Sequence, residues 1–298
     1  MIRKAPTLRA KYRTVALVAN VGKPAVRALA PKLMEIFGRF GVRARAVPEV
    51  KKTFKGFSLL QAAPFSRIAE GSDMVLSLGG DGTMLSAASL AVAEGIPVLG
   101  VNLGNLGFIT PVSLESFESS LSDSLRGLYK IQRRSMLRAR ITRRGKLVSD
   151  RIALNDVVIL RGATAKVALL ETRINGKYLA TYKADGLIVA TPTGSTAYSL
   201  AVGGPILDTA VQNIVLAPIC PHTLSARPLV LADSSVIEIL VPKTHARLNF
   251  STDGEPGFWL QKGDKLTVTR ARQSVQLLVP PGYDAWEVLR SKLGWLGR

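Results

Sequence analysis

The sequence predicts an α/β first domain built on a largely parallel sheet, followed by a β-rich second domain. Strand and helix candidates alternate from Thr14 to about Gly127, whereas short β-rich segments dominate from Tyr129 onward. The length of 298 residues also suits two domains, at roughly 100 to 200 residues each. We therefore predict domains at 1–127 and 128–281, with a C-terminal helix over 282–298 that joins the first domain.

In the first domain, apolar β-branched runs predict strands and longer periodic segments predict helices. Because strands and helices alternate, the helices are expected to cover the faces of a parallel sheet. The predicted strands are 15–19, 43–47, 73–78 and 97–101, and the predicted helices are 24–40, 83–94 and 114–125.

The second domain is predicted from a series of short apolar segments separated by turn residues. The last segment of the chain, Tyr283 to Leu293, is a helix candidate with Trp286 and Leu289 on one face. The predicted strands are 136–143, 153–160, 168–174, 178–183, 186–190, 214–218, 236–241, 248–252, 265–271 and 275–279.

Composition indicates a folded protein of a reducing compartment. Hydrophobic residues make up 47% and charged residues 20%, which argues against disorder. The charge-free runs contain Pro, Gly and Asn, unlike a membrane span, and no signal peptide is evident. The single cysteine, Cys220, cannot form an intrachain disulfide, so we expect a cytoplasmic protein. It follows the apolar run Ile214 to Ile219, which predicts a buried, inert thiol.

The net charge of +19 needs an interpretation. A basic field attracts polyanions, so a nucleic-acid-binding protein is one alternative, yet no nucleic-acid-binding motif accompanies the charge. The alternation around Arg138 to Arg143 favours a solvated hairpin turning near Arg144 to Lys146, and we expect at most weak, non-specific polyanion binding. The basic residues concentrated there are Lys130, Arg133, Arg134, Arg138, Arg140, Arg143, Arg144 and Lys146.

A glycine-rich corner follows the strand candidate Met74 to Leu78. Gly79, Gly80 and Gly82 surround Asp81, and Thr83 opens a predicted helix. Glycine backbones can approach phosphate oxygens closely, and a helix N-terminus favours an anion. These residues, Gly79, Gly80, Gly82 and Thr83, are therefore a candidate phosphate-binding loop, the alternative being an ordinary surface turn.

A second glycine-rich corner, Gly100 to Phe108, follows the next strand candidate. Two such corners at the ends of successive strands are what a nucleotide crevice requires. Common nucleotide signatures are absent: Pro24 follows Gly22-Lys23 where a P-loop needs Ser or Thr, and no G-x-G-x-x-G is present. With only two histidines, a bound metal would be a hard ion held through carboxylates and substrate phosphates.

Four further motifs lie in the second domain. Asn155-Asp156 opens a strand, and Tyr182 to Leu200 combines a charged turn, a strand and a hydroxyl-rich loop that ends at Tyr198. Pro221 to Val230 and Asp253-Gly254-Glu255 complete the set. Each alone is compatible with turn chemistry, but hydroxyls and small residues beside an aromatic ring fit a nucleotide held by hydrogen bonds and stacking.

Taken together, in this order and at these separations, the motifs resemble the ATP-dependent NAD kinases of bacterial type. The resemblance spans nearly the whole chain, and Ser291 to Trp295 is similar to the ending of bacterial members. Lipid kinases and phosphofructokinases share the glycine-aspartate-glycine corner, so a lipid or sugar kinase is the alternative within the same class. Thr191 to Tyr198 makes the resemblance specific.

The resemblance implies a Rossmann-like nucleotide domain, a sandwich-like second domain and transfer of the γ-phosphoryl group of ATP to the 2′-hydroxyl of the adenosine ribose of NAD. It implies Asp81 as the catalytic residue and Mg²⁺ or another divalent cation bridging the ATP phosphates. ATP and NAD are the implied partners, in a homodimer or homotetramer.

The resemblance also implies the NAD-binding residues. Asp156 stands where many members have Glu, which shortens the side chain by one methylene but keeps its charge, and Glu255 stands where an amide is common. Tyr198 is expected to stack on the adenine. The implied residues are Asp81, Gly82, Asn155, Asp156, Lys183 and Asp185, the adenine wall Thr196, Ala197, Tyr198, Ser199, Leu200 and Ala201, and the lesser contacts Lys166 and Glu255.

Overall fold

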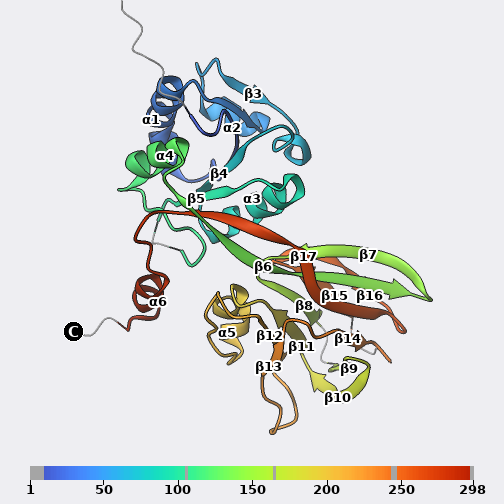
Figure 1. Cartoon of the computed structure of the whole chain (residues 1–298). Helices are drawn as coiled ribbons and strands as arrows, with labels where there is room; N and C mark the ends of the chain where they lie inside the picture. Colours follow the sequence, from blue (N-terminus) through green and yellow to red (C-terminus); the bar gives the residue numbers. More distant parts are fainter. Residues whose placement is uncertain (1–9, 105–106, 164–165, 243–246, 296–298) are drawn as a thin grey trace, which may run out of the picture. The chain divides into compact units, whose positions relative to one another are not determined.

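Parallel strands form the sheet of the first of two structural units (Figure 1). The computed structural model describes residues 10–104, 107–163, 166–242 and 247–295. The first unit comprises Met1–Arg133 and Val275–Arg298, and the second comprises Arg134–Ser274. In the first unit the strand order is β3-β2-β1-β4-β5, with the end of β17 beside β5. The strands are β1 (Thr14–Ala19), β2 (Arg43–Ala46), β3 (Leu60–Ala62), β4 (Met74–Gly79), β5 (Val98–Asn102) and β17 (Lys265–Val279).

The strand order reverses between β1 and β4. The chain runs from β1 outward through β2 and β3, and then returns to place β4 on the other side of β1. In open parallel sheets, ligands bind outside the carboxyl ends of the strands at such a switch point. The topology therefore directs attention to Ala19, at the end of β1, and to Gly79, at the end of β4.

The helices of the first unit begin and end at recognisable capping residues. Helix α1 (Pro24–Phe40) has the predicted bounds, because Pro24 starts it and Gly41, at φ 64°, ends it. Helix α3 (Asp81–Glu94) begins two residues earlier than predicted, since extended Gly80 is already its N-cap. The others are α2 (Pro48–Thr53), which was not predicted, α4 (Phe117–Arg126) and α6 (Ala285–Leu293).

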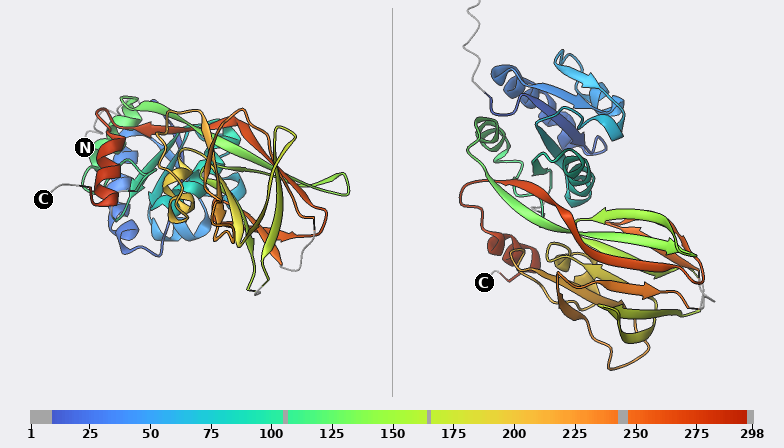
Figure 2. Two further views of the ribbon diagram at one scale, coloured as in Figure 1. Left: turned by 90° about the horizontal axis from the view of Figure 1, so that it is seen from below. Right: turned by 45° about the vertical axis from the view of Figure 1, so that its right-hand side comes forward.

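Two sheets form the second unit (Figure 2). In one, the order is β10-β9-β14-β17, with β6 beside β17 and β7 beside β6. The other is antiparallel, in the order β13-β12-β11-β8-β15-β16. The strands are β6 (Lys130–Arg143), β7 (Lys146–Ala153), β8 (Asp156–Arg161), β9 (Ala168–Ile174), β10 (Lys177–Ala184), β11 (Gly186–Ala190), β12 (Asn213–Ile219), β13 (Leu229–Ala232), β14 (Ile237–Leu240), β15 (Leu248–Thr252) and β16 (Glu255–Leu260).

Alternate side chains of these strands pack between the two sheets. Ile239 of the first sheet and Ile159, Leu187 and Phe250 of the second belong to one buried cluster. Their neighbours on the other face of the second sheet, such as Ile188, form a separate buried cluster. The period of two along each strand thus gives the predicted sandwich-like architecture.

The basic segment forms the predicted hairpin, β6 and β7. Arg144 and Gly145, at φ 50° and 77°, make its two-residue turn. Asp150 accepts hydrogen bonds from Arg138 and Arg140, while Asp264 accepts two from Arg143 at 2.8 Å. Part of the charge on this segment is therefore compensated by one acid of the same hairpin, Asp150, and by one distant in sequence, Asp264.

The prediction that Cys220 is buried was wrong. The residue is exposed and has a φ of 44°, just beyond Ile219, the last paired residue of β12. No neighbouring strand covers a residue that lies past the end of the ladder, so the apolar run before it gave a misleading signal. None of the helices in the described part of the chain is both long enough and apolar enough to cross a membrane.

Candidate functional site

A cavity of about 480 Å³ opens where the strand order reverses in the first unit. The end of β1 contributes one wall, and the corner between β4 and α3 contributes the other. Of the predicted phosphate-binding residues, Gly80, Gly82 and Thr83 line it. The remaining lining residues are Val18, Ala19, Asn20, Lys23, Phe65 and Ser86.

The three glycines of the corner have different physical roles. A Cβ on Gly79 would lie 2.2 Å from Oγ1 of Thr83, so the tight turn itself requires glycine there. A Cβ on Gly80 would lie 3.7 Å from Nζ of Lys23, on the cavity side. A Cβ on Gly82 would meet no atom within 4 Å, so packing among the described residues does not explain this glycine. Its bare backbone leaves room for a ligand to approach.

The first turn of α3 makes the cavity favourable for an anion. Met84 is the first residue of the helix whose amide donates to a backbone carbonyl of the turn, that of Gly80, at 3.0 Å. Amides before that point have no acceptor within the helix, and they carry its partial positive charge. The Lys23 amine adds a full positive charge beside them. This combination suits phosphate oxygens.

Asp81 joins the first glycine-rich corner to the second. Its carboxylate accepts hydrogen bonds from the amide of Phe108 at 3.1 Å, the amide of Ile109 at 3.4 Å and the hydroxyl of Thr110 at 3.1 Å. Gly107 fits closely above it, since a Cβ there would lie 2.1 Å from Oδ1 of Asp81. The part of the second corner at 105–106 lies outside the described residues.

In the second unit, Asp253 holds the Asn155-Asp156 corner. Its carboxylate accepts hydrogen bonds from the amides of Leu154, Asn155 and Asp156 at 2.7, 2.7 and 3.1 Å. Asp253 and Gly254, at φ 51° and 75°, also form the turn between β15 and β16. The same residue therefore makes a hairpin turn and fixes the start of β8.

Asp156 is a buried carboxylic acid, only 5% exposed. Burial raises its pKa to about 7, and the negative charge of Asp253 adds to this effect. Three backbone amides bind Asp253, whereas none of the hydrogen bonds described for the chain involves the side chain of Asp156. The side chain of Asp156 thus keeps its hydrogen-bonding capacity for a ligand.

The hydroxyl-rich loop packs directly on this corner. Thr191 donates its hydroxyl proton to the carbonyl of Leu154 at 2.6 Å, and its amide donates to the carbonyl of Asn155 at 2.9 Å. A Cβ on Gly194 would lie 2.0 Å from the Asn155 carbonyl oxygen, so glycine is required there. The loop and the start of β8 therefore form one packed unit.

The predicted adenine wall follows this loop. Tyr198 is 38% exposed, and the pKa of its phenol is raised by partial burial and then by electrostatic interaction with Cys220, Asp156 and Asp185. Ser199 is buried, and its hydroxyl has no described hydrogen-bond partner. Thr196, Ala197 and Leu200 are half-buried, and Ala201 is exposed.

Asp185 lies at the far end of the same strand pair. Arg161 holds it with hydrogen bonds of 2.5 and 3.3 Å to its two oxygens. Since Ala190 pairs with Asp156 and Gly186 with Leu160, the strands separate Asp156 from Asp185 by about 16 Å, at about 3.3 Å per residue. Such a span suits an elongated ligand better than a single sugar.

The remaining predicted residues are on the surface of the second unit. Lys183 is exposed and lines a cavity of about 280 Å³ between β10 and the segment from Pro221 to Leu229. Lys166 and Glu255 are exposed. Within this unit, the structure thus gathers Asn155, Asp156 and the hydroxyl-rich loop into one packed cluster, but not Lys166 or Glu255.

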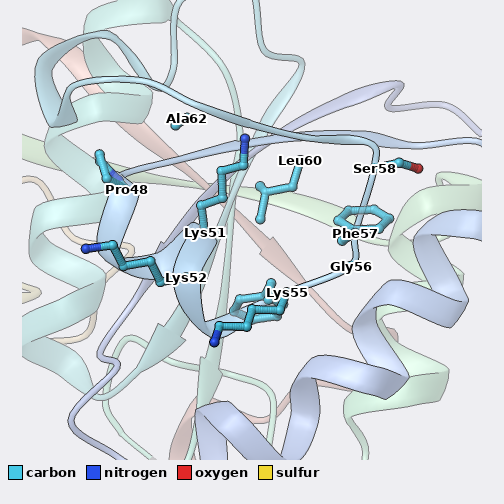
Figure 3. A pocket seen from close by; sticks show the side chains of 10 residues that line it. Pro48, Lys51, Lys52, Lys55, Gly56, Phe57, Ser58, Leu60 and Ala62 are labelled. Atoms are coloured by element: carbon cyan, nitrogen blue, oxygen red, sulfur yellow. The ribbon is translucent and has the colours of Figure 1, made fainter.

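A further cavity of about 630 Å³ lies beside α2 and β3 (Figure 3). Its lining includes Lys51, Lys52 and Lys55 around apolar side chains. Figure 3 shows the three amines pointing in different directions, so they do not converge on one ligand group. Among the described residues, no three His, Cys, Asp or Glu side chains gather as a metal-binding group.

Sequence reasoning missed several residues that build the site. Lys23 belongs to an incomplete P-loop pattern, yet it lines the cavity at the switch point of the sheet. Arg161 and Thr110 gave no motif signal, because their partners Asp185 and Asp81 are 24 and 29 positions away. Asp253 was part of a predicted motif, but its hydrogen bonds to the amides of Leu154, Asn155 and Asp156 were not predicted.

The parallel sheet, the glycine corner at its switch point and a single fixed carboxylate define a nucleotide-dependent phosphotransferase. Comparison with known families narrows this class: residues 16–129 match the ATP-NAD kinase N-terminal domain, and residues 154–279 match the ATP-NAD kinase C-terminal domain. The chain belongs to the ATP-NAD kinase family, and the reaction is the phosphorylation of NAD.

Individual relatives agree with this assignment. The chain is 42% identical to an NAD kinase of Citrifermentans bemidjiense, over 95% of this chain and 99% of that one. It is 40% identical to an NAD kinase of Geotalea daltonii, with the same coverage. Among solved structures, yeast NADH kinase complexed with NADH aligns with a TM-score of 0.86 and 28% identity, covering 96% of this chain and 89% of that one. An Archaeoglobus fulgidus NAD kinase in complex with ATP shares the fold, with a TM-score of 0.69, 22% identity and coverage of 94% and 97%.

Proposed function

We propose that Asp81 is the catalytic carboxylate of this NAD kinase. The 2′-hydroxyl oxygen of the adenosine ribose attacks the γ-phosphorus of ATP, and the bond between this phosphorus and the oxygen that bridges it to the β-phosphate breaks. ADP leaves, Asp81 accepts the hydroxyl proton, and NAD becomes NADP. The observation that carries the proposal is the fixed carboxylate of Asp81, held by three donors beside the amides of a helix N-terminus. Positioning and charge neutralisation dominate phosphoryl transfer, so one such carboxylate is sufficient.

The cavity at the switch point is the proposed site of the ATP phosphates. The backbone of Gly80 to Thr83 donates to phosphate oxygens, and Lys23 neutralises part of their charge. Asn20, Thr83 and Ser86, whose side chains carry oxygen atoms, line the same cavity, and oxygen is the ligand that a hard cation prefers. Mg²⁺ or a similar divalent cation, when bound, supplies further neutralisation of the transferring group.

The second unit provides the proposed NAD contacts. Asn155 and Asp156 bind the adenosine end, where the unfilled hydrogen-bonding capacity of Asp156 suits ribose hydroxyls or the adenine amino group. Tyr198 stacks on the adenine, within the wall from Thr196 to Ala201. Lys183 and Asp185 flank the dinucleotide, and Lys166 and Glu255 make lesser contacts.

We also propose a cytoplasmic homodimer or homotetramer. A subunit count by light scattering on the purified protein tests the assembly, and a monomer at assay concentration would contradict it.

The experiment for the reaction is NADP formation from NAD, ATP and Mg²⁺, read with an NADP-specific coupled dehydrogenase. The Asp81→Asn variant is expected to keep its fold and NAD affinity, while kcat falls by about 10²- to 10⁴-fold. Chelation of divalent cations with EDTA should abolish the wild-type activity, and added Mg²⁺ should restore it.

Matched substrates separate the alternatives. NADH replaces NAD in a parallel assay, because one structural neighbour is an NADH kinase. Near-normal turnover in Asp81→Asn would remove Asp81 from the catalytic role. Phosphorylation of a sugar or lipid in the absence of any NAD or NADH phosphorylation would overturn the proposed reaction altogether.

A further inference from the structure

Two buried polar side chains lie behind Asp81. Thr110 is fully buried, and Asn102, the last residue of β5, is 5% exposed. The amide nitrogen of Asn102 lies 2.8 Å from the Thr110 hydroxyl, which lies 3.1 Å from Oδ1 of Asp81. Burying two polar side chains is costly unless they are hydrogen-bonded, and here they are bonded to each other and to Asp81.

The donor and the acceptor can be assigned for each hydrogen bond that links Asn102, Thr110 and Asp81. The backbone amide of Gly104 donates to Oδ1 of Asn102 at 3.0 Å, so the other side-chain atom of Asn102 is its amide nitrogen. That nitrogen can only donate, so the Thr110 oxygen accepts from it. The Thr110 proton is consequently free to point at one acceptor, Oδ1 of Asp81.

The two oxygens of Asp81 are therefore not equivalent. Among the described residues, Oδ1 receives the Thr110 hydroxyl and the Ile109 amide, whereas Oδ2 receives the Phe108 amide alone. A carboxylate oxygen has about two lone pairs, so Oδ1 is fully engaged and Oδ2 retains one. The fixed arrangement leaves one defined position at which a substrate proton can be received.

We propose that Thr110 is a positioning residue for the phosphoryl transfer: oriented by Asn102, it holds Oδ1 of Asp81 and thereby presents Oδ2 to the ribose hydroxyl. The inference rests on the proposed catalytic role of Asp81. It assigns to the buried residues Asn102 and Thr110 a function in turnover, because misorientation of a reacting group slows the reaction even where substrate binding is intact.

The test compares Thr110→Val, which removes the hydroxyl at nearly constant shape, with Thr110→Ser, which keeps it. Thr110→Val is expected to lower kcat by about 10- to 100-fold while the KM values for NAD and ATP stay unchanged. Thr110→Ser is expected to restore most of the lost turnover. Thr14→Val, which removes another buried hydroxyl of the same unit, hydrogen-bonded to Arg43, is the matched control and should leave kcat unchanged.

A double-mutant cycle with Asp81→Asn separates positioning from structure. If Thr110 acts through Asp81, Thr110→Val should cost nothing further in the Asp81→Asn background, measured at high enzyme concentration. An equal loss in both backgrounds, or wild-type kcat in Thr110→Val, would overturn the proposal. Should Thr110→Val melt early, Asn102→Asp serves instead: its carboxylate can only accept, so it draws the Thr110 proton away from Asp81 and should lower kcat, and unchanged kcat there counts against the proposal.

Failure of the underlying function has a different signature. Near-normal turnover in Asp81→Asn alone removes the catalytic role of Asp81. Impaired Asp81→Asn beside fully active Thr110→Val leaves that role intact and rejects only the positioning of Asp81 by Thr110.

Discussion

Asp81 and Asp156 are two carboxylic acids of the same chain with opposite surroundings. Asp81 accepts three hydrogen bonds from the segment Phe108 to Thr110 and stands at a helix N-terminus. Asp156 is buried beside a second acid, Asp253, and its side chain takes part in none of the described hydrogen bonds. One acid is held in place by the folded chain, whereas the other retains unused capacity.

The difference teaches how one residue type supports two tasks. A group that must receive a proton at a fixed place needs a fixed geometry, which the donors around Asp81 supply. A group that recognises a ligand can leave its hydrogen bonds open until the ligand arrives, at a cost to the stability of the empty protein. On this interpretation, Asp156 is destabilising without ligand, and the following predictions test it.

The largest expected effect is on the pH dependence of stability. Burial raises the pKa of Asp156 to about 7, against about 3.9 for an unfolded Asp, so the folded state holds this proton more tightly. The contribution to stability is full below about pH 4 and is lost as pH rises through 7, by about 4 kcal/mol at most. Asp156→Asn should therefore be close to wild type at pH 4.5 but more stable at pH 8.

Urea unfolding of both proteins at pH 4.5, 6 and 8 measures this effect. The informative quantity is the difference between the two free energies of unfolding, because other titrating groups, including Asp253, are common to both proteins. A difference that stays constant over this pH range would mean that Asp156 ionises normally in the folded state.

The next effect is on NAD binding. Asp156→Ala removes a hydrogen-bonding group whose proposed partner is the adenosine end, and hydrogen bonds to charged groups contribute about 1.5 to 3 kcal/mol. Calorimetric titration at pH 8 should show NAD affinity lower by about 10- to 100-fold. In the activity assay, the KM for ATP should stay unchanged. Glu238→Ala, which removes a half-buried acid paired with Lys265, is the control. Equal affinities for all three proteins would exclude Asp156 from the NAD site.

A smaller effect is expected at Tyr198. Stacking of a base on an aromatic ring contributes about 1 to 3 kcal/mol, and the partial exposure of Tyr198 favours the lower part of this range. Tyr198→Ala should raise the Kd for NAD by about tenfold, while Tyr198→Phe keeps the ring and should bind normally. Tyr178→Ala, at an exposed tyrosine of β10, is the control. If the Phe variant is as weak as the Ala variant, the hydroxyl matters and stacking does not.

The sequence predicted the fold class correctly, and it located the first glycine corner, because both depend on near neighbours. The α1 bounds follow from Pro24 and Gly41, and the first glycine corner is contained in five consecutive residues. Short elements such as α2 and β3 were missed, because three to six residues carry too little periodicity to be distinguished from loop.

What the sequence could not give are contacts between distant residues. The hydrogen bond from the Asn155 amide to Asp253 joins positions 98 apart, and the hydrogen bond from Thr110 to Asp81 joins positions 29 apart. Cys220 illustrates the converse error, in which the apolar strand before it suggested burial although the ladder ends one residue earlier. Such facts depend on which strands are neighbours and where their pairing stops.

The smallest effect concerns Lys23, which tests whether the first unit recognises phosphate mainly through its backbone. The Lys23 side chain is only half-buried, so solvent screens its attraction for phosphate, and about 1 kcal/mol is expected from it. Lys23→Ala should raise the KM for ATP by about fivefold with little change in kcat, whereas Lys51→Ala, at the cavity whose amines diverge, should change neither. Neither substitution removes a backbone amide, so a modest loss in Lys23→Ala beside a large loss in Asp81→Asn is the pattern expected of a site in which the main chain binds and one side chain reacts. A rise of several hundredfold in the KM for ATP in Lys23→Ala would instead give the lysine the principal role in holding the phosphates, and binding mainly through the main chain would be wrong.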